Sequence, residues 1–221
     1  SGIGSLEVGA TLTIGNYLAT LLISDFMQRH PGSRVRLQVR NTRSIIDAVR
    51  HHQLDLGLIE GQCEEDEVIT QPWVEDDLVV FCSPRHPLAN RGPVELDRLL
   101  REDWIMREEG SGTRLTLEQA ARHRRGRFNI LLELEHTEGI KRAVESGLGI
   151  GCVSRLALRD AFRRGSLTPL PTPELDLSRQ FTFIWHRHKY LTAGMREFLR
   201  QCRQMTEGIQ RSDEIDLPQV P

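Results

Sequence analysis

Alternating strand and helix patterns in the first 59 residues constrain the fold more than any other feature of this chain. Residues 6–10, 35–39 and 54–59 are apolar, or alternate apolar with polar side chains, as strands do. Between them, apolar side chains recur at helical spacing in residues 14–28 and 45–49. Strands joined by helices through short links form parallel sheets, because each helix returns the chain to the same edge. The sequence therefore predicts an α/β fold.

The same alternation continues to residue 205 with less regular connections. Pro84, Pro87 and Pro93 mark an irregular link after one strand. The further strands and helices are predicted, in chain order, at residues 78–82, 94–100, 104–106, from 115, 130–134, 138–146, 150–153, 181–185 and 191–205.

We interpret this pattern as two α/β lobes. The first lobe is predicted to comprise residues 1–82 and 181–206, and the second residues 83–180. The chain is predicted to pass from one lobe to the other near Cys82–Ser83 and to return near Arg179–Gln180. These two positions are candidate hinges. The last segment, residues 207–221, contains acidic residues and two prolines, and we expect it to be a disordered tail.

The charge balance argues against non-specific binding of nucleic acid. The 29 Lys and Arg and the 31 Asp and Glu give a formal net charge of -2. The basic run Arg122-His-Arg-Arg-Gly-Arg127 is interpreted as the solvated end of a helix, with phosphate contact as the alternative. There is no apolar run of the roughly 20 residues that span a bilayer, and no signal segment opens the sequence. Because the four cysteines lack Cys-x-x-Cys spacing, we expect a reduced, cytoplasmic protein without a membrane partner.

The stretch Arg107-Glu-Glu-Gly-Ser-Gly-Thr-Arg114 has the features of an anion site. A predicted strand leads into two glycines that flank Ser111, and a helical pattern follows. This order aims backbone N–H groups and the positive end of a helix at one point, where Ser111 and Thr113 add hydroxyl donors. The alternative is an ordinary capped helix N-terminus.

Polar residues also follow the strands of the first lobe. In open α/β sheets, ligands bind outside the carboxyl ends of the strands. Those ends lie here at residues 10–13, 41–44, 60–61 and 109–114, and three of the four are rich in Ser, Thr and Asn. Their convergence predicts a small-ligand cleft.

Several motifs together resemble the effector-binding portion of LysR-type transcriptional regulators over essentially the whole chain. The motifs are Leu6-Glu-Val-Gly-Ala10, Phe26-x-x-x-His-Pro31, Leu54-Asp-Leu-Gly-Leu-Ile59, Leu78-Val-Val-Phe81 with His86-Pro-Leu88, Ala143-Val-Glu-Ser-Gly-Leu-Gly-Ile-Gly151 and Trp185-His-Arg-His-Lys-Tyr-Leu191. The likeness is greatest to the YeiE-like branch, which is related to the CysB-like regulators. It rests on Thr13-Ile-Gly-Asn-Tyr17, Leu58-Ile-Glu-Gly61, Gln71-Pro-Trp-Val-Glu-Asp76 and the stretch from Arg107 to Arg114.

The resemblance implies an α/β fold of two Rossmann-like lobes, like that of type 2 periplasmic binding proteins, with a ligand cleft between the lobes that holds a small anionic effector. It implies association with sulfur metabolism and with oxyanions such as sulfite or sulfate. It also implies self-association, as a homodimer and as a tetramer in the full-length protein. DNA would be bound only through an N-terminal winged helix-turn-helix that is missing from this sequence. No cofactor and no metal are expected.

The resemblance also assigns the effector contacts to named positions. Thr11 and Thr13 would bind from the first-strand loop, and Asn41, Thr42 and Ser44 from the second loop. From the second lobe, Ser111, Gly112 and Thr113 would offer hydroxyl and backbone N–H donors.

Three charged residues have open roles in this prediction. Arg114 either faces the ligand or braces the turn from behind. Glu60 would repel an anion, so it is paired with Arg114 or Lys141, is protonated, accepts a proton from a ligand such as bisulfite, or forms a salt bridge between the lobes. Glu138 is a ligand contact or a first-turn acid that favours the helix dipole.

Other classes of protein fit the sequence less well. Gly147-Leu-Gly-Ile-Gly151 follows a helix and precedes a strand, the reverse of a dinucleotide fingerprint. There is no Gly-x-Ser-x-Gly or His-Glu-x-x-His motif, and His51-His52 and His186-Arg-His188 lack companion ligands at metal spacing. We therefore predict no catalytic residues. A solute-binding protein for a small anion or carboxylate, or an oligomerisation module without a ligand, are the alternatives.

Overall fold

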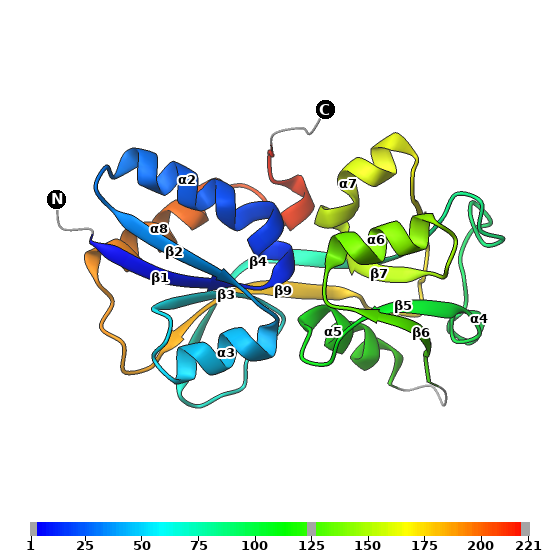
Figure 1. Ribbon diagram of the computed structural model, residues 1–221, viewed down its shortest axis with the longest axis horizontal. Helices are drawn as coiled ribbons and strands as arrows, with labels where there is room; N and C mark the ends of the chain where they lie inside the picture. The colour runs from blue at the N-terminus through cyan, green and yellow to red at the C-terminus, as the bar shows by residue number, and fades with distance from the viewer. Residues whose placement is uncertain (1–3, 123–126, 218–221) are drawn as a thin grey trace. The chain divides into compact units, whose positions relative to one another are not determined.

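The computed structural model describes residues 4–122 and 127–217, and the chain forms two units (Figure 1). Unit 1 comprises Ser1–Glu75 and Gln180–Ile215, and unit 2 comprises Asp76–Arg179 and Asp216–Pro221. The chain therefore changes unit between Glu75 and Asp76 and between Arg179 and Gln180. The first change falls earlier than the predicted crossing after residue 82, because a single long strand, β4 (Val68–Cys82), contributes residues to both units.

Unit 1 contains the predicted parallel sheet. Strand β1 (Ser5–Ala10) is parallel to β2 (Arg34–Val39) and to β3 (Leu56–Glu60), and β9 (Ser178–His186) is antiparallel to β3. The strand order is β2-β1-β3-β9-β4. The chain leaves β1 in one direction to form β2 and returns past it to form β3. Because such crossovers are right-handed, the two connecting helices are expected on opposite faces of the sheet, as Figure 1 shows for α2 and α3.

The helices of unit 1 bury the faces that their apolar spacing predicts. The first helix consists of α1 (Leu12–Ile14), a π-helical stretch η1 (Gly15–Ala19) and α2 (Thr20–Arg29). In α3 (Thr42–Arg50), Ile45 and Val49 enter a core cluster with Ile59. In α8 (Ala193–Met205), the predicted inner residues are buried, and they are Met195, Phe198, Leu199 and Cys202.

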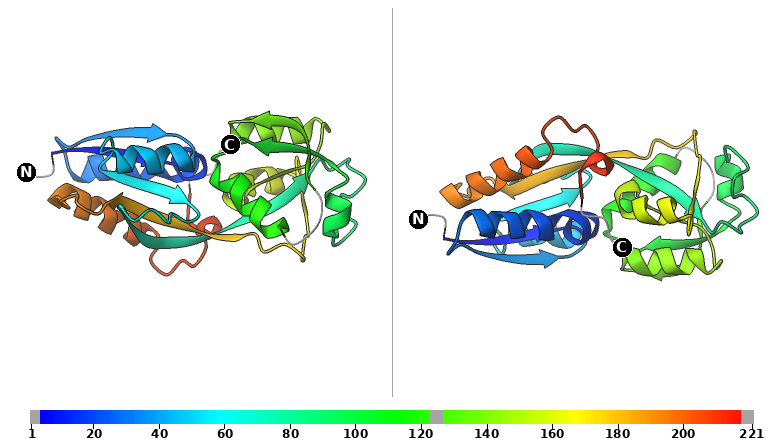
Figure 2. Two further views of the ribbon diagram at one scale, coloured as in Figure 1. Left: turned by 90° about the horizontal axis from the view of Figure 1, so that it is seen from below. Right: turned by 90° about the horizontal axis from the view of Figure 1, so that it is seen from above.

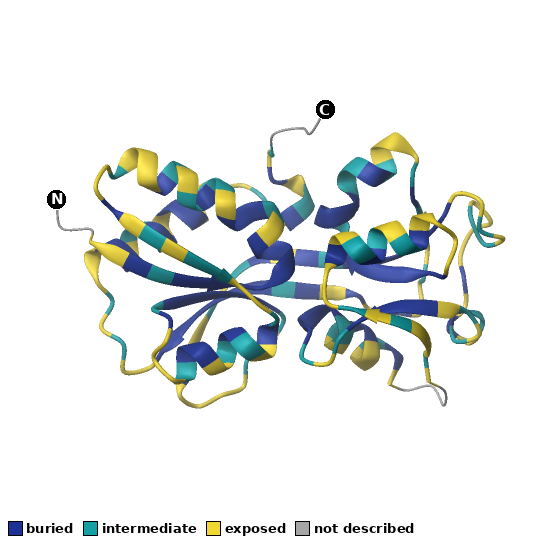
Figure 3. Cartoon of the chain, viewed as in Figure 1, coloured by how far each residue is buried: buried dark blue, intermediate teal, exposed yellow. Residues whose placement is uncertain are grey.

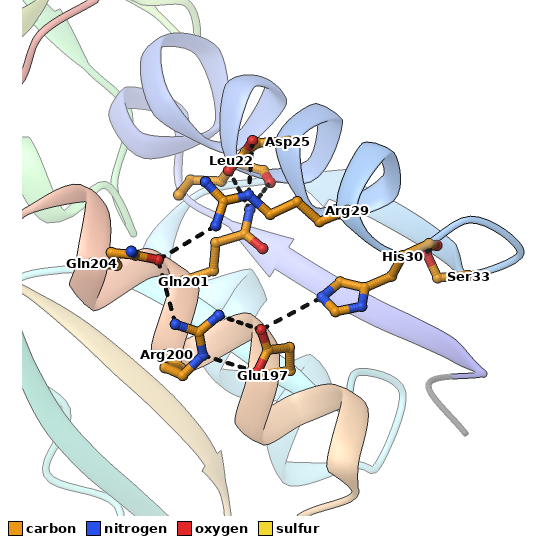
Figure 4. Close-up of polar contacts among 9 residues, drawn as sticks. All are labelled: Leu22, Asp25, Arg29, His30, Ser33, Glu197, Arg200, Gln201 and Gln204. Carbon is orange, nitrogen blue, oxygen red and sulfur yellow. Dashed lines mark hydrogen bonds and ion pairs between the residues drawn. The ribbon is translucent and has the colours of Figure 1, made fainter. Parts of the chain in front are cut away.

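Polar side chains form hydrogen bonds between α2 and α8 beside the apolar contact of these helices (Figure 4). The rings of Phe26 and Phe198 meet edge to face with centroids 5.5 Å apart. Beside them, the buried Gln201 amide donates to the carboxylate of Asp25 at 2.7 Å and to the carbonyl of Leu22 at 3.4 Å. These bonds give the buried amide nitrogen its acceptors and add to the apolar contact between α2 and α8.

Unit 2 is built around a buried tryptophan. Strand β5 (Asp103–Arg107) is parallel to β6 (Asn129–Leu134), and the β4 segment 78–82 is antiparallel to β7 (Gly151–Ser154) and β8 (Thr168–Leu170). The helices are α4 (Leu96–Leu99), α5 (Gly112–Ala121), α6 (Thr137–Glu145) and α7 (Arg155–Arg164). Trp104 of β5 is fully buried in the core cluster, and its indole N–H donates to the carbonyl of Leu99 at 2.8 Å. Figure 3 shows the buried strand residues.

Several elements differ from the sequence prediction. The predicted strand 78–82 begins ten residues earlier, at Val68, where Pro72 and interspersed charges obscure the strand pattern. The helix predicted at 94–100 is only Leu96–Leu99. No element was predicted between residues 154 and 180, where α7 and β8 form. The interpretation of residues 122–127 as a helix end falls largely on residues 123–126, outside the described chain.

The described part of the last segment is ordered against unit 1, in contrast to the predicted disordered tail. Glu75 of β4 donates its backbone N–H to the carbonyl of Gln210 at 3.2 Å and forms a parallel bridge with Arg211. A 3-10 helix, η2 (Ser212–Glu214), follows, and Ile215 is fully buried (red end of the ribbon in Figure 2). One apolar side chain and the backbone pairing outweigh the polar composition that suggested disorder.

Candidate functional site

In unit 1, the end of β1 leads directly into the first helix. Thr11 is the N-cap, and its backbone N–H donates to the carbonyl of Leu58 at 3.0 Å, which holds the turn against the end of β3. Thr11 and Thr13 are both buried. The structure thus places the two predicted threonines at the carboxyl edge of the parallel sheet, where the sequence predicted them.

The carboxylate of Glu60 lies at the N-terminus of this first helix. Glu60 ends β3, is 2% exposed, and accepts a hydrogen bond from the backbone N–H of Thr13 at 2.6 Å. An acid is favourable at this position because the helix dipole is positive there. Consequently, the backbone N–H of Thr13, a residue that was predicted to bind the effector, is already bonded to an acid of the chain itself.

Arg114 and Lys141, the cations considered as partners of Glu60, each lie beside an acidic side chain of unit 2. Arg114 forms ion pairs with Glu118 and Glu133, each at 2.7 Å, and Lys141 pairs with Glu138 at 3.1 Å. Each of these two cations thus has an acidic partner within unit 2, and within unit 1 the Glu60 carboxylate accepts from the backbone N–H of Thr13.

The hydroxyl of Thr11 is a buried polar group that the described residues leave without a hydrogen bond. Thr11 is 0% exposed. A buried hydroxyl without a partner costs about 1–3 kcal/mol, so proteins retain few of them unless a ligand or water satisfies the group. This hydroxyl is therefore a candidate ligand contact.

The second predicted loop meets the same sheet edge. Asn41 is the N-cap of α3, and its side-chain oxygen accepts from the backbone N–H of Ser44 at 2.9 Å. Thr42 is buried and its hydroxyl donates to the carbonyl of Glu60 at 3.4 Å. Thr42 and Glu60 are thus brought together with the first loop, while the Asn41 oxygen acts as an ordinary cap.

In unit 2, the turn before α5 presents two buried hydroxyls. Gly110 has φ +92°, a left-handed conformation that favours glycine, and the chain then enters α5 through the N-cap Ser111. The Ser111 hydroxyl accepts from the backbone N–H of Arg114 at 3.2 Å. The Thr113 hydroxyl accepts from the Arg179 guanidinium at 3.0 Å. Since each hydroxyl already accepts from an N–H group, each retains its own proton for donation.

Arg114 braces this turn. Its guanidinium donates to the carbonyl of Arg107 at 3.1 Å in addition to its pairs with Glu118 and Glu133. The bonds to Arg107 and Glu133 tie the first turn of α5 to β5 and β6, and the pair with Glu118 lies within α5. Of the two roles predicted for Arg114, the structure supports the bracing role.

Arg179 is a functional candidate that the sequence prediction missed as a site residue. Its side chain is 2% exposed and forms an ion pair with the fully buried Asp76 at 2.7 Å, while also reaching Thr113. Asp76 accepts in turn from the Ser154 hydroxyl at 2.7 Å. The sequence positions of these two residues could have pointed to them. Arg179 lies at a predicted hinge, and Asp76 ends one of the motifs that carry the family resemblance.

Glu138 lies in the first turn of α6, exposed and paired with Lys141. This is the arrangement that the first-turn interpretation predicts. The histidines also pack against one another, with the rings of His52 and His186 at a centroid distance of 4.1 Å. Among the described residues, no group of three or more His, Cys, Asp or Glu is arranged to hold a metal ion.

The buried cysteines are poor nucleophiles. Burial raises the pKa of the Cys82 thiol to about 11 and that of Cys152 to about 12. Because the thiolate is the reactive form, these side chains behave as small hydrophobes at neutral pH, as the sequence indicated. Within the described residues, no helix is long and apolar enough to cross a membrane.

Comparison with known proteins identifies the relatives of this chain. It is 40% identical over 199 residues to the uncharacterized HTH-type transcriptional regulator YeiE of Escherichia coli (strain K12), covering 90% of this chain and 68% of that protein. It is 31% identical over 181 residues to the transcriptional regulator CysL of Bacillus subtilis (strain 168), covering 82% of this chain and 60% of CysL.

Solved structures show the same two-lobe fold. The CcmR regulatory domain of Synechocystis, in complex with 2-PG, has a TM-score of 0.87 at 30% identity, covering 95% of this chain and all of that one. The cofactor-binding domain of the Cbl transcriptional regulator has a TM-score of 0.80 at 21% identity, covering 91% of this chain and 88% of that one. The relatives are transcriptional regulators with effector-binding domains and not enzymes, in agreement with the sequence prediction. The LysR substrate binding domain family matches residues 2–207, and the chain belongs to that family.

Proposed function

We propose that this chain senses a small anion, with sulfite or another sulfur oxyanion as the first candidate, for a LysR-type transcriptional regulator. The chain spans 68% of the length of the YeiE regulator. In the full-length regulator, DNA would be bound by a winged helix-turn-helix domain. The regulator would form a cytoplasmic homo-oligomer, a dimer or tetramer, whose arrangement responds to the effector.

The observation that carries the proposal is the donor character of the turn before α5. Ser111 and Thr113 are buried, and both hydroxyls use their oxygens to accept from N–H groups. What they offer a ligand is therefore hydrogen-bond donation, next to the positive end of a ten-residue helix. Such a turn favours a ligand that only accepts, which is what the oxygens of an anion do.

Unit 1 presents a hydrogen-bond acceptor, in contrast to the donors of the turn before α5. The unbonded Thr11 hydroxyl can donate to a ligand oxygen, but the buried Glu60 carboxylate accepts hydrogen bonds and repels negative charge. A ligand that contacts Thr11 and Glu60 should thus combine acceptor oxygens with one proton directed at Glu60. Bisulfite, the protonated form of sulfite, meets this requirement near neutral pH, whereas sulfate carries no proton there.

The response to the effector follows from linkage. A ligand that binds one conformation more tightly shifts the population toward that conformation by the difference in binding free energy. We propose that the two chain crossings, at Glu75–Asp76 and Arg179–Gln180, absorb this change and alter how protomers of the regulator meet.

Isothermal titration calorimetry of the 221-residue chain tests the proposal. The panel contains sulfite, sulfate, thiosulfate, phosphate, benzoate, O-acetylserine and 2-PG, the last because the CcmR relative was solved with it. Thr113→Val removes one proposed contact. Thr168→Val makes the same change on β8 as a matched control.

We expect one sulfur oxyanion to bind, Thr113→Val to weaken it and Thr168→Val to leave it unchanged. Binding of 2-PG or a carboxylate alone would retain an effector-binding domain but overturn the sulfur assignment. Equal weakening by both valine variants would remove Thr113 from the binding site.

A further inference from the structure

A chain of buried polar side chains in unit 2 connects the turn before α5 to the places where the chain enters and leaves that unit. Asp76 is the first residue of unit 2 after β4 leaves unit 1, and Arg179 is the last before Gln180. Their ion pair joins these two positions at 2.7 Å, with both side chains buried. The same guanidinium donates to the Thr113 hydroxyl at 3.0 Å.

The chain extends in the other direction to α7. The Ser154 hydroxyl donates to Asp76 at 2.7 Å and accepts from the backbone N–H of Leu156 at 3.1 Å, which caps α7. Ser154 is 0% exposed. One network of buried hydrogen bonds therefore runs from the N-terminus of α7, through both crossing strands, to the N-terminus of α5.

The arginine determines how the Thr113 hydroxyl can act. A hydroxyl has one proton and acceptor lone pairs, and it rotates to suit its neighbours. Because a guanidinium donates and cannot accept, its bond to the Thr113 oxygen directs the hydroxyl proton away from Arg179. Asp76, which bonds the guanidinium Nε, holds the arginine in the orientation that makes this possible.

We infer that Arg179 and Asp76 are positioning residues for anion recognition, acting through the Thr113 hydroxyl. This inference rests on the proposed function, because it assumes that Thr113 contacts the effector. It adds that recognition depends on a buried ion pair at the chain crossings. The network thereby gives the crossing strands a direct hydrogen-bonded connection to the turn that binds the ligand.

A double-mutant cycle tests the inference. The variants are Arg179→Lys, Thr113→Val and the combination of both, and the probe is sulfite, or the panel anion that gives the largest heat. Lysine keeps the positive charge beside Asp76, so the protein is expected to fold. Its single ammonium replaces a planar fork that bonds Asp76 and Thr113 at once. Thermal melts of each variant check folding.

If Arg179 acts through Thr113, the two changes are not independent. Each single variant should weaken binding about tenfold, the scale of one hydrogen bond to a charged partner. The double variant should also bind about tenfold more weakly, because the arginine has no further effect once the hydroxyl is gone. Arg98→Lys makes the same chemical change in the Arg98–Glu102 ion pair of unit 2 and should bind like the wild type.

The outcomes separate this inference from the proposed function. A wild-type chain that binds no anion of the panel overturns both. A wild-type chain that binds, with a double variant about a hundredfold weaker, shows independent effects and overturns the positioning role alone. Wild-type affinity in Arg179→Lys overturns it as well.

Discussion

The first helix of unit 1 and helix α5 of unit 2 begin in similar ways and present different chemistry. Both follow a strand and both begin with buried hydroxyl residues, Thr11 and Thr13 in one case and Ser111 and Thr113 in the other. At the first helix, a backbone donor is already bonded to the Glu60 carboxylate. At α5, the neighbouring cation Arg179 bonds a hydroxyl oxygen instead.

This difference shows that the rest of the fold decides which donors at a helix N-terminus stay available to a ligand. The two helix starts meet opposite charges, because strands distant in the chain bring a carboxylate to one and a guanidinium to the other. The predictions below test this contrast, beginning with the largest expected effect.

Loss of the buried arginine should affect stability most. Arg179→Met leaves the buried Asp76 carboxylate without its guanidinium, and we expect the free energy of unfolding to fall by about 3–5 kcal/mol. Urea denaturation measures this value. Lys189→Met in unit 1 removes a more exposed pair with Asp55 and should cost about 1 kcal/mol or less.

The combined variant Arg179→Met with Asp76→Leu is the control for this prediction. It removes both charges, so most of the lost stability should return. A double variant as unstable as Arg179→Met would show that the arginine contributes through packing and not through its charge.

Neutralising the acid of unit 1 should change which anion binds. Glu60→Gln retains an oxygen that can accept from Thr13 but removes the negative charge. We expect the preference for sulfite over sulfate to fall by roughly 2 kcal/mol, the scale of a hydrogen bond to a charged group. Calorimetric titration of both anions measures the ratio of their dissociation constants. An unchanged ratio would mean that Glu60 does not contact the ligand.

Truncating the threonine of unit 2 should weaken binding moderately. Thr113→Ala removes a donor to the effector, and we expect a loss of about 1–2 kcal/mol in binding free energy. The same titration provides the dissociation constant. If the dissociation constant stays at the wild-type value, Thr113 is not in contact with the ligand.

The smallest effect is expected from the two N-caps. Ser111→Ala and Asn41→Ala each remove a side-chain acceptor of a helix N–H, at 3.2 and 2.9 Å respectively, and each should cost about 1 kcal/mol of stability. We expect Ser111→Ala to weaken anion binding more than Asn41→Ala does, because the Ser111 hydroxyl, besides capping α5, keeps a proton that it can donate to the proposed anion. If both variants weakened anion binding equally, the loop before α3 and the turn before α5 would not differ in their contribution to anion binding.

Local sequence patterns predicted the parts of the fold that depend on nearby residues. The apolar spacing of α3 and α8 and the strand–helix alternation of β1 to β3 were sufficient, because each element buries the face that its own period defines. The pattern failed for β4 before residue 78 and for the segment 212–215. There, pairing with distant strands and burial of one isoleucine decide the structure.

The sequence by itself therefore determined the fold class, the family resemblance and the position of the turn before α5. Only the tertiary structure decided which partner each buried charged side chain meets. Thr113 and Arg179 are 66 residues apart, Asp76 and Arg179 are 103 apart, and Thr13 and Glu60 are 47 apart. The physical reason is that side-chain pairing across such separations is set by how whole elements pack, which no local period encodes.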